Sequence, residues 1–193
     1  MYYLLGEHLS HSYSKEIHDL LGNKDYDLLN IGKEELPNFI LKKEFLGLNI
    51  TIPYKEAIFK YIDKLDDISF KTQVVNTVVN HNGILSGYNT DYYGFLSMCK
   101  KYKIGFKNRT ALILGSGATS KTVHLCLINQ GIEKTYIVSR NKQQGCITYD
   151  EAEQMTTIDY IINTTPNGMF PHIEDKAMLN LKYHFLNKQP LLH

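Results

Sequence analysis

The chain has 193 residues, 43% of them hydrophobic, with 21 basic and 20 acidic residues and a formal net charge of +1. This length suits one large domain or two small ones, and the apolar fraction is that of a globular protein with a core. The near-neutral balance argues against a general nucleic-acid binder, which would carry a basic face. No apolar run approaches a membrane span and the N-terminus lacks signal-peptide features, so the expected location is cytoplasmic.

Cysteine and histidine usage argues against a disulfide framework and against a metal site. Cys99, Cys126 and Cys146 are odd in number and show neither disulfide nor zinc-ligand spacing, so reduced thiols are expected. The eight histidines are scattered without an H-x-x-x-H or similar pair. A metal site is therefore not expected.

The first half of the chain alternates short apolar runs with helix-like segments. Strands are predicted at residues 2–5, 26–31 and 45–52, and helices at residues 14–22, 33–43, 54–62 and 90–102. Pro53 suits the first turn of the helix that follows it. Two further apolar runs, 73–79 and 83–88, flank Asn82-Gly83, a strong turn signal that predicts a β-hairpin.

The pattern restarts after a basic, glycine-containing stretch at Lys100–Asn108, which is the expected domain boundary. Strands are predicted at residues 110–115, 134–139 and 158–163, and helices at residues 119–131 and 150–155. Strands that alternate with helices imply a parallel sheet with right-handed crossovers. The predicted fold class is therefore α/β, with a mostly parallel sheet in an N-terminal domain of residues 1–100 and a second α/β domain at 101–193.

A glycine turn joins the first strand and the first helix of the second half. Gly115 would permit a tight turn, and Gly117 would let the backbone approach a pyrophosphate at the helix N-terminus. This is the context of a dinucleotide-binding fingerprint, although its third position is Ser120, small but not glycine. By itself the match does not decide between a Rossmann-like nucleotide site and a plain strand–helix turn.

The next strand ends in Ser139, Arg140 and Asn141, with no acid to accept a hydrogen bond from a ribose 2′-hydroxyl. A planar, charged guanidinium suits a 2′-phosphate, so Arg140 and the glycine turn together favour NADP over NAD. A solvated arginine at a strand end is the alternative. Beyond the third strand, Thr164 and Thr165 would face the dinucleotide, or would belong to a simple turn.

Polar clusters lie at element junctions in the first half. Ser12 and Ser14 precede a helix, where they could cap it or, on extended backbone, point one way and hold a carboxylate. Thr90 or Asn89 could cap a later helix. Asp91 would lie in the first turn of that helix, which is also a good structural position for an acid.

A third cluster lies where a predicted strand meets a helix. Asn49 and Thr51 share one face of the strand, and Lys55 follows in the first helical turn. A lysine there is unfavourable to the helix dipole, so it has no local reason for its position. A lone surface lysine is the alternative. Asn76 interrupts an apolar run and, if buried, needs a partner, which a ligand would supply.

These motifs together resemble the shikimate dehydrogenase family. Seven stretches match in the family's order, from Met1 to about Pro171: His11–Ser14 with His18 downstream, Asn49–Lys55, Val75–Thr77, Asn89–Phe95, the glycine turn at 115–118, Ser139–Asn141 and Asn163–Met169. Seven ordered motifs with similar spacing are far more specific than any one of them.

The resemblance implies a reversible, NADP-dependent reduction of 3-dehydroshikimate to shikimate, in the biosynthesis of chorismate and the aromatic amino acids. The substrate-binding residues it implies are Ser12, Ser14, Thr51, Asn76 and Asp91. The serines would hold the carboxylate and the other three the ring hydroxyls. Lys55 and Asp91 would form the catalytic pair, with Lys55 giving the proton to the reacting oxygen and Asp91 orienting its ammonium.

The resemblance also implies how the domains divide the work. Residues 1–100 would be the shikimate-binding catalytic domain, and residues 101–193 an incomplete Rossmann-like NADP-binding domain. The cofactor-binding residues it implies are Gly115, Ser116, Gly117, Ala118, Thr119, Ser139, Arg140, Asn141 and Thr164. The expected partner is the small-molecule substrate, shikimate or 3-dehydroshikimate. No nucleic acid and no membrane are expected as partners, and the chain could form a homodimer.

The sequence departs from the family pattern in a few places. Lys15 replaces a proline, Ala118 replaces the third glycine of a G-x-G-G-A turn, and Lys121 replaces an arginine with charge kept. Family members continue to a glycine-rich turn near the nicotinamide and a closing helix with a substrate-touching glutamine. This chain stops at His193, and its last residues, 183–193, resemble neither, so the resemblance is to a C-terminally truncated member.

Two alternatives follow from the resemblance and its departures. The first is a folded but weakly active or inactive remnant that binds shikimate. The second is a quinate/shikimate dehydrogenase, which would use NAD more readily and against which Arg140 argues.

Overall fold

The computed structural model describes residues 1–10, 12–169 and 173–175. Some expectations from the sequence concern residues outside these ranges, namely His11, Pro171 and the run 183–193. The chain divides into two compact units between Tyr93 and Gly94. Among the described residues, no helix combines the length and the apolar character that a membrane span needs.

The first unit is built on a six-stranded sheet in the order β2-β1-β3-β5-β6-β4. Its strands are β1 (Tyr2–Gly6), β2 (Tyr26–Asn30), β3 (Gly47–Ile50), β4 (Lys64–Leu65), β5 (Thr77–His81) and β6 (Ile84–Tyr88). Its helices are α1 (Ser14–Leu20), α2 (Leu36–Lys42), α3 (Tyr54–Ala57), the 3₁₀ helix η1 (Phe59–Tyr61), α4 (Asp67–Thr72) and the start of α5 (Thr90–Lys101).

The sheet of the first unit is mixed. Strand β1 pairs in parallel with β2 and β3, and β4 pairs in parallel with β6, whereas β5 is antiparallel to both its neighbours. The predicted hairpin is confirmed, because β5 and β6 are joined by Asn82 (φ 51°) and Gly83 (φ 82°). Two successive residues with positive φ make the turn whose twist matches the strands.

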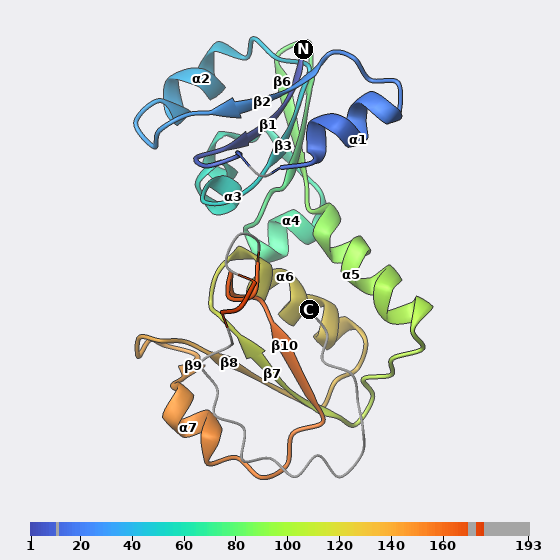
Figure 1. Ribbon diagram of the computed structural model, residues 1–193, viewed down its shortest axis with the longest axis vertical. Coiled ribbons are helices and arrows are strands. Elements are labelled where there is room, and N and C mark those ends of the chain that lie inside the picture. The colour runs from blue at the N-terminus through green and yellow to red at the C-terminus, as the bar shows by residue number, and fades with distance from the viewer. Residues whose placement is uncertain (11, 170–172, 176–193) are drawn as a thin grey trace. The chain divides into compact units, whose positions relative to one another are not determined.

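Both faces of this sheet are covered, and alternate residues of β1 show how. Leu5 belongs to the main core with Ile40 of α2 and Leu48 of β3. Leu4 points the other way, into a smaller cluster with Leu9 and Tyr26. Helices α1 and α2 lie on opposite faces of the sheet (Figure 1). The carboxyl ends of β1 and β3 therefore stay open to the loops that carry polar residues.

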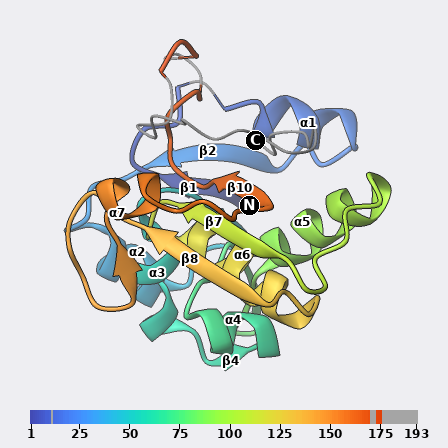
Figure 2. The same ribbon diagram turned by 90° about the horizontal axis from the view of Figure 1, so that it is seen from below.

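The second unit is built on a parallel four-stranded sheet in the order β10-β7-β8-β9. Figure 2 shows its strands β10, β7 and β8 side by side. Its strands are β7 (Thr110–Leu114), β8 (Lys134–Val138), β9 (Cys146–Ile147) and β10 (Tyr160–Asn163). Helix α6 (Ala118–Asn129) follows β7, and α7 (Tyr149–Glu153) precedes β10. The alternation of strand and helix gives the parallel arrangement that the sequence predicts.

Neighbouring residues of β7 are buried on opposite faces of the second sheet. Ile113 packs with Val123 and Leu127 of α6. Leu112, on the other face, packs in a cluster with Ala152 of α7. Strand β7 is therefore covered on both sides, which explains its continuous apolar sequence.

Some predicted elements need correction. The single helix predicted at 54–62 is wrong, because α3 ends at Ala57 and the chain tightens into η1. The Asp63 amide then donates to the Leu85 carbonyl at 3.0 Å, which draws the chain to the sheet edge and ends the helical stretch. The helix predicted at 33–43 begins only at Leu36. The short elements β4, α4 and β9 were not predicted.

Candidate functional site

The centre of the first unit's polar cluster is an ion pair between Lys55 and Asp91. Lys55 lies in the one-turn helix α3 and Asp91 in the first turn of α5. Lys55 Nζ lies 2.7 Å from Asp91 Oδ2, and the two side chains are 16% and 36% exposed. The Lys55 carbonyl also accepts from the Val75 amide at 2.8 Å, which ties α3 to the segment before β5.

Asn76 links this ion pair to the hairpin. Its Nδ2 donates to Asp91 Oδ1 at 2.8 Å and to Thr90 Oγ1 at 2.9 Å. Its Oδ1 accepts from the Thr90 amide at 2.9 Å and from Thr77 Oγ1 at 3.1 Å. Asn76 is 8% exposed, so the polar group that interrupts the apolar run finds its partners within the chain. Both oxygens of Asp91 are thereby held in place.

Asn49 extends the cluster toward the N-terminal serines. Its Nδ2 reaches Thr77 Oγ1 at 3.5 Å, and its Oδ1 accepts from the Tyr26 hydroxyl at 2.9 Å. Ser14 also hydrogen-bonds to that hydroxyl. Because strands β2, β1 and β3 are neighbours in the sheet, Tyr26 and Asn49 meet across β1. Neither Tyr26 nor Thr77 was among the predicted site residues.

The two serines lie together at the start of α1. Ser12 Oγ donates to Ser14 Oγ at 3.1 Å, and the Ser14 amide donates to Ser12 Oγ at 3.2 Å. The two hydroxyls therefore lie side by side at the start of α1. Thr51 follows the end of β3, and its methyl group would lie 2.7 Å from a Cβ added at Gly6. A glycine at position 6 thus leaves the space that Thr51 occupies.

In the second unit, the glycine turn is a genuine structural requirement. Gly115 has φ +103°, a conformation that side chains rarely adopt, and a Cβ there would lie 3.0 Å from Thr164 Oγ1. Thr164 Oγ1 donates to the Leu114 carbonyl at 2.6 Å. The end of β10 is thereby attached to the turn after β7, so the structure brings the predicted Thr164 to the glycine turn.

The ends of β7 and β8 also meet. Ser116 Oγ lies 3.3 Å from Ser139 Oγ, and Gln143 Nε2 donates to Ser139 Oγ at 3.0 Å. Ser139 is 7% exposed, whereas Arg140 and Asn141 are exposed. The start of the predicted 139–141 segment therefore lies beside the glycine turn, and its Arg140 is exposed.

The start of α6 is open at its first glycine. Gly117 is the N-cap of α6 and has no side chain to bond the first helical amides. A Cβ added at Gly117 would meet nothing within 4 Å among the described residues. Helix N-termini favour anions through their free amides and dipole. Open space, a helix start and a nearby arginine are compatible with a phosphorylated dinucleotide.

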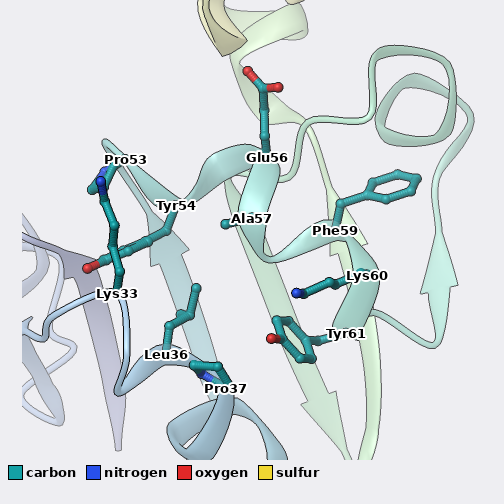
Figure 3. A pocket seen from close by; sticks show the side chains of 10 residues that line it. All are labelled: Lys33, Leu36, Pro37, Pro53, Tyr54, Glu56, Ala57, Phe59, Lys60 and Tyr61. Carbon is teal, nitrogen blue, oxygen red and sulfur yellow. The ribbon is translucent and has the colours of Figure 1, made fainter.

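A pocket of about 340 Å³ lies elsewhere in the first unit (Figure 3). Leu36 and Pro37 of α2 line it together with Ala57 of α3 and Phe59 of η1. Lys55 is not among its lining residues, so α3 contributes to the polar cluster and to this pocket with different side chains. The pocket contains none of the predicted site residues.

The part of the chain that the structure describes contains no group of three or more histidine, cysteine or acidic residues that could hold a metal ion. Cys99 and Cys126 are buried, and burial raises the pKa of each thiol to about 11. These two cysteines are therefore core residues.

The fold and the glycine turn define a class: α/β proteins with a strand–helix turn of the dinucleotide-binding kind. Comparison with known proteins is more specific. The family model for the shikimate dehydrogenase substrate binding domain matches residues 4–78. The shikimate dehydrogenase (NADP(+)) of Clostridium beijerinckii is 38% identical over 190 residues, covering 90% of this chain and 70% of the relative.

Solved structures agree with this match. Shikimate dehydrogenase 1 from Peptoclostridium difficile has a TM-score of 0.78 at 37% identity, over 88% of this chain and 68% of that one. The shikimate 5-dehydrogenase of Thermus thermophilus, solved in complex with NADP(H) and shikimate, has a TM-score of 0.74 at 28% identity, over 86% and 69%. The chain belongs to the shikimate dehydrogenase family, a family of oxidoreductases. The predicted family and the α/β fold class are confirmed.

The chain spans about 70% of the length of the curated relatives it matches, from 69% to 76% among those most similar. These relatives are named as dependent on NADP(+), in agreement with the predicted cofactor.

Proposed function

We propose that this chain catalyses the reversible, NADP-dependent reduction of 3-dehydroshikimate to shikimate. The observation that carries the proposal is the Lys55–Asp91 ion pair of 2.7 Å at one end of a hydrogen-bonded cluster. The cluster runs from Asp91 through Asn76, Thr77 and Asn49 toward the serines. A small polyol acid needs such a set of fixed donors and acceptors, because its hydroxyls and carboxylate must each be matched.

The substrate residues take the roles that the family resemblance implies. Ser12 and Ser14 hold the carboxylate, because their hydroxyls lie 3.1 Å apart. Thr51, Asn76 and Asp91 bind ring hydroxyls. Asn76 is buried and bonded to Asp91, so its amide is held in one orientation. Preorganised polar groups of this kind reduce the entropy that binding costs.

Lys55 acts as the general acid–base group. On reduction, its ammonium gives a proton to the carbonyl oxygen, and on oxidation the amine accepts that proton from the hydroxyl. Asp91 orients the ammonium through the 2.7 Å contact. NADPH, when held by the second unit, would supply the hydride for the carbonyl carbon. A proton and a hydride together balance the conversion of a ketone to an alcohol.

The second unit holds the cofactor in this proposal. Residues 1–100 form the substrate domain and 101–193 the nucleotide domain. The turn from Gly115 to Thr119 takes the pyrophosphate, Ser139, Arg140 and Asn141 take the ribose 2′-phosphate, and Thr164 lines the turn. The support is the φ of +103° at Gly115 and the contacts that join Ser116 to Ser139. A cytoplasmic location and a homodimer stay predictions from the sequence.

A cofactor-linked absorbance assay tests the proposal, with shikimate and then quinate, each with NADP and with NAD. We expect turnover with shikimate and NADP in preference to the other combinations. Preference for quinate with NAD would instead support a quinate/shikimate dehydrogenase. Calorimetric titration of shikimate and NADP, run beside the assay, detects a chain that binds both and turns over slowly. Absence of binding and of turnover would contradict the proposal.

A further inference from the structure

Tyr26 lies where the polar cluster passes from the serines to the rest of the site. It is the first residue of β2 and is 3% exposed. Its hydroxyl donates to Asn49 Oδ1 at 2.9 Å and is hydrogen-bonded by the side chain of Ser14. A phenol can donate one hydrogen bond while it accepts another. One buried oxygen atom therefore joins Ser14 to Asn49.

Burial strengthens the preference of this hydroxyl for its protonated form. It raises the pKa of Tyr26 to about 12, while the Ser14 hydrogen bond acts in the opposite direction. The group therefore remains a donor throughout the neutral range. Because Asn49 Oδ1 accepts from it, Asn49 must present its Nδ2 to the other side, toward Thr77. The phenol thus determines which way the Asn49 amide faces.

Helix α1 holds the Tyr26 ring at a second point. The His18 ring stacks on it with centroids 3.6 Å apart and an angle of 5° between the planes. Ser14 and His18 are four residues apart and so lie on one face of α1. The same helix face therefore fixes both the plane of the ring and the hydroxyl at its end. This gives a role to His18, which the proposed chemistry does not use.

We propose that Tyr26, held by His18, is the positioning residue that aligns the carboxylate-binding Ser14 with Asn49. It acts through these two residues and, being buried, does not touch the substrate. The inference rests on the proposed function, since Ser14 matters only if a carboxylate binds there. Without the Tyr26 hydroxyl the chain would still fold, but Ser14 and the Asn49 amide would no longer be held in one orientation.

Tyr26→Phe tests the inference, with Tyr54→Phe as a matched control. Tyr54 is also buried in the first unit, at 1% exposure, but its hydroxyl donates to the Ile31 carbonyl at 2.6 Å, away from the cluster. Both changes remove one buried hydroxyl. Calorimetric titration of the 193-residue chain should show shikimate affinity reduced about two- to tenfold in Tyr26→Phe, the range of a lost hydrogen bond, and nearly unchanged in Tyr54→Phe.

A double-mutant cycle with Ser14→Ala separates positioning from general loosening of the fold. If Tyr26 acts through Ser14, Tyr26→Phe should weaken shikimate binding much less in the Ser14→Ala background than in the wild type. Equal effects in both backgrounds, or equal losses in the two phenylalanine variants, would overturn the inference. If Tyr26→Phe binds shikimate with wild-type affinity, only the inference about Tyr26 is overturned. If the wild-type chain binds no shikimate, the proposed function is overturned as well.

Discussion

Lys55 and Asp91 are 36 residues apart in the sequence, and their charged groups lie 2.7 Å apart in the folded chain. One is held in the single turn of α3 and the other in the first turn of α5. Asn76, between them in the sequence, bonds to the second oxygen of the Asp91 carboxylate. Asn76 thus orients the carboxylate, and the carboxylate orients the ammonium.

Lys55→Ala should lower kcat for shikimate oxidation by about 10²–10⁴-fold, the usual effect of removing a general acid–base group. Shikimate affinity should change little, because the binding groups remain. Steady-state kinetics and calorimetric titration measure the two quantities. Lys60→Ala, a nearby exposed lysine whose ammonium lies over the Tyr61 ring, is the control. Turnover that survives within a factor of a few would make Lys55 a surface residue.

Arg140→Ala should weaken NADP binding and leave NAD binding nearly unchanged, because only NADP carries the 2′-phosphate. A charge-assisted hydrogen bond contributes about 1.5–3 kcal/mol, which corresponds to about tenfold and upward in affinity. Calorimetric titration with both cofactors provides the comparison. Lys142→Ala, two residues further along the same exposed segment, should have a smaller effect. Equal losses for the two cofactors would give Arg140 another role.

Gly115→Ala and Gly117→Ala should separate folding from cofactor binding. Gly115 has a φ of +103°, which is strained for alanine, and the added Cβ would lie 3.0 Å from Thr164 Oγ1. The Gly115→Ala variant should therefore lose about 1–3 kcal/mol of unfolding free energy. At Gly117 the added methyl group meets open space, so stability should fall by less than about 1 kcal/mol. NADP affinity should nevertheless drop in Gly117→Ala. Denaturant unfolding and NADP titration test the pair, and the reverse order of stabilities would contradict this account.

Ser120→Ala should leave the chain as stable as the wild type or make it more stable, by up to about 1 kcal/mol. Ser120 is 1% exposed, and its hydroxyl has no hydrogen-bond partner among the described residues. Removing an unpartnered buried hydroxyl relieves a desolvation cost. Thr122→Ala is the contrast, since Thr122 Oγ1 donates to the Ala118 carbonyl at 3.1 Å. A clear loss of unfolding free energy in Ser120→Ala would mean that its hydroxyl is satisfied.

His124 should contribute a loss of stability on mild acidification. Burial lowers the pKa of its imidazole below the ordinary 6.5. The folded state therefore prefers the neutral ring. The stability that His124 contributes is fully present above its pKa in the unfolded chain, and it is lost as the pH falls from that value through its pKa in the folded chain. The difference in unfolding free energy between about pH 7.5 and about pH 5 should shrink in His124→Gln. An NMR titration that gives His124 a pKa at or above 6.5 would contradict this.

Where local chemistry decides the structure, the sequence was a sufficient guide. Asn82-Gly83 predicts a tight hairpin because both residues tolerate positive φ, and both have it. Gly115 is similar, since the turn between a buried strand and a helix needs its φ of +103°. The short elements were harder. Strand β4 has two residues and exists only through its pairing with β6, so no periodicity within it could reveal it.

Sequence patterns alone predict the α/β class, the order of the main strands and helices, and the residue types that the proposed site needs. These depend on periodicity, turn chemistry and ordered motifs, all of which are properties of neighbouring residues. The hydrogen-bond partners of the polar groups, in contrast, become known only from the folded chain. Tyr26 meets Asn49 because β2, β1 and β3 are neighbours in one sheet, although the two residues are 23 positions apart. Contacts of that kind arise from sheet pairing and burial, which no local pattern in the chain encodes.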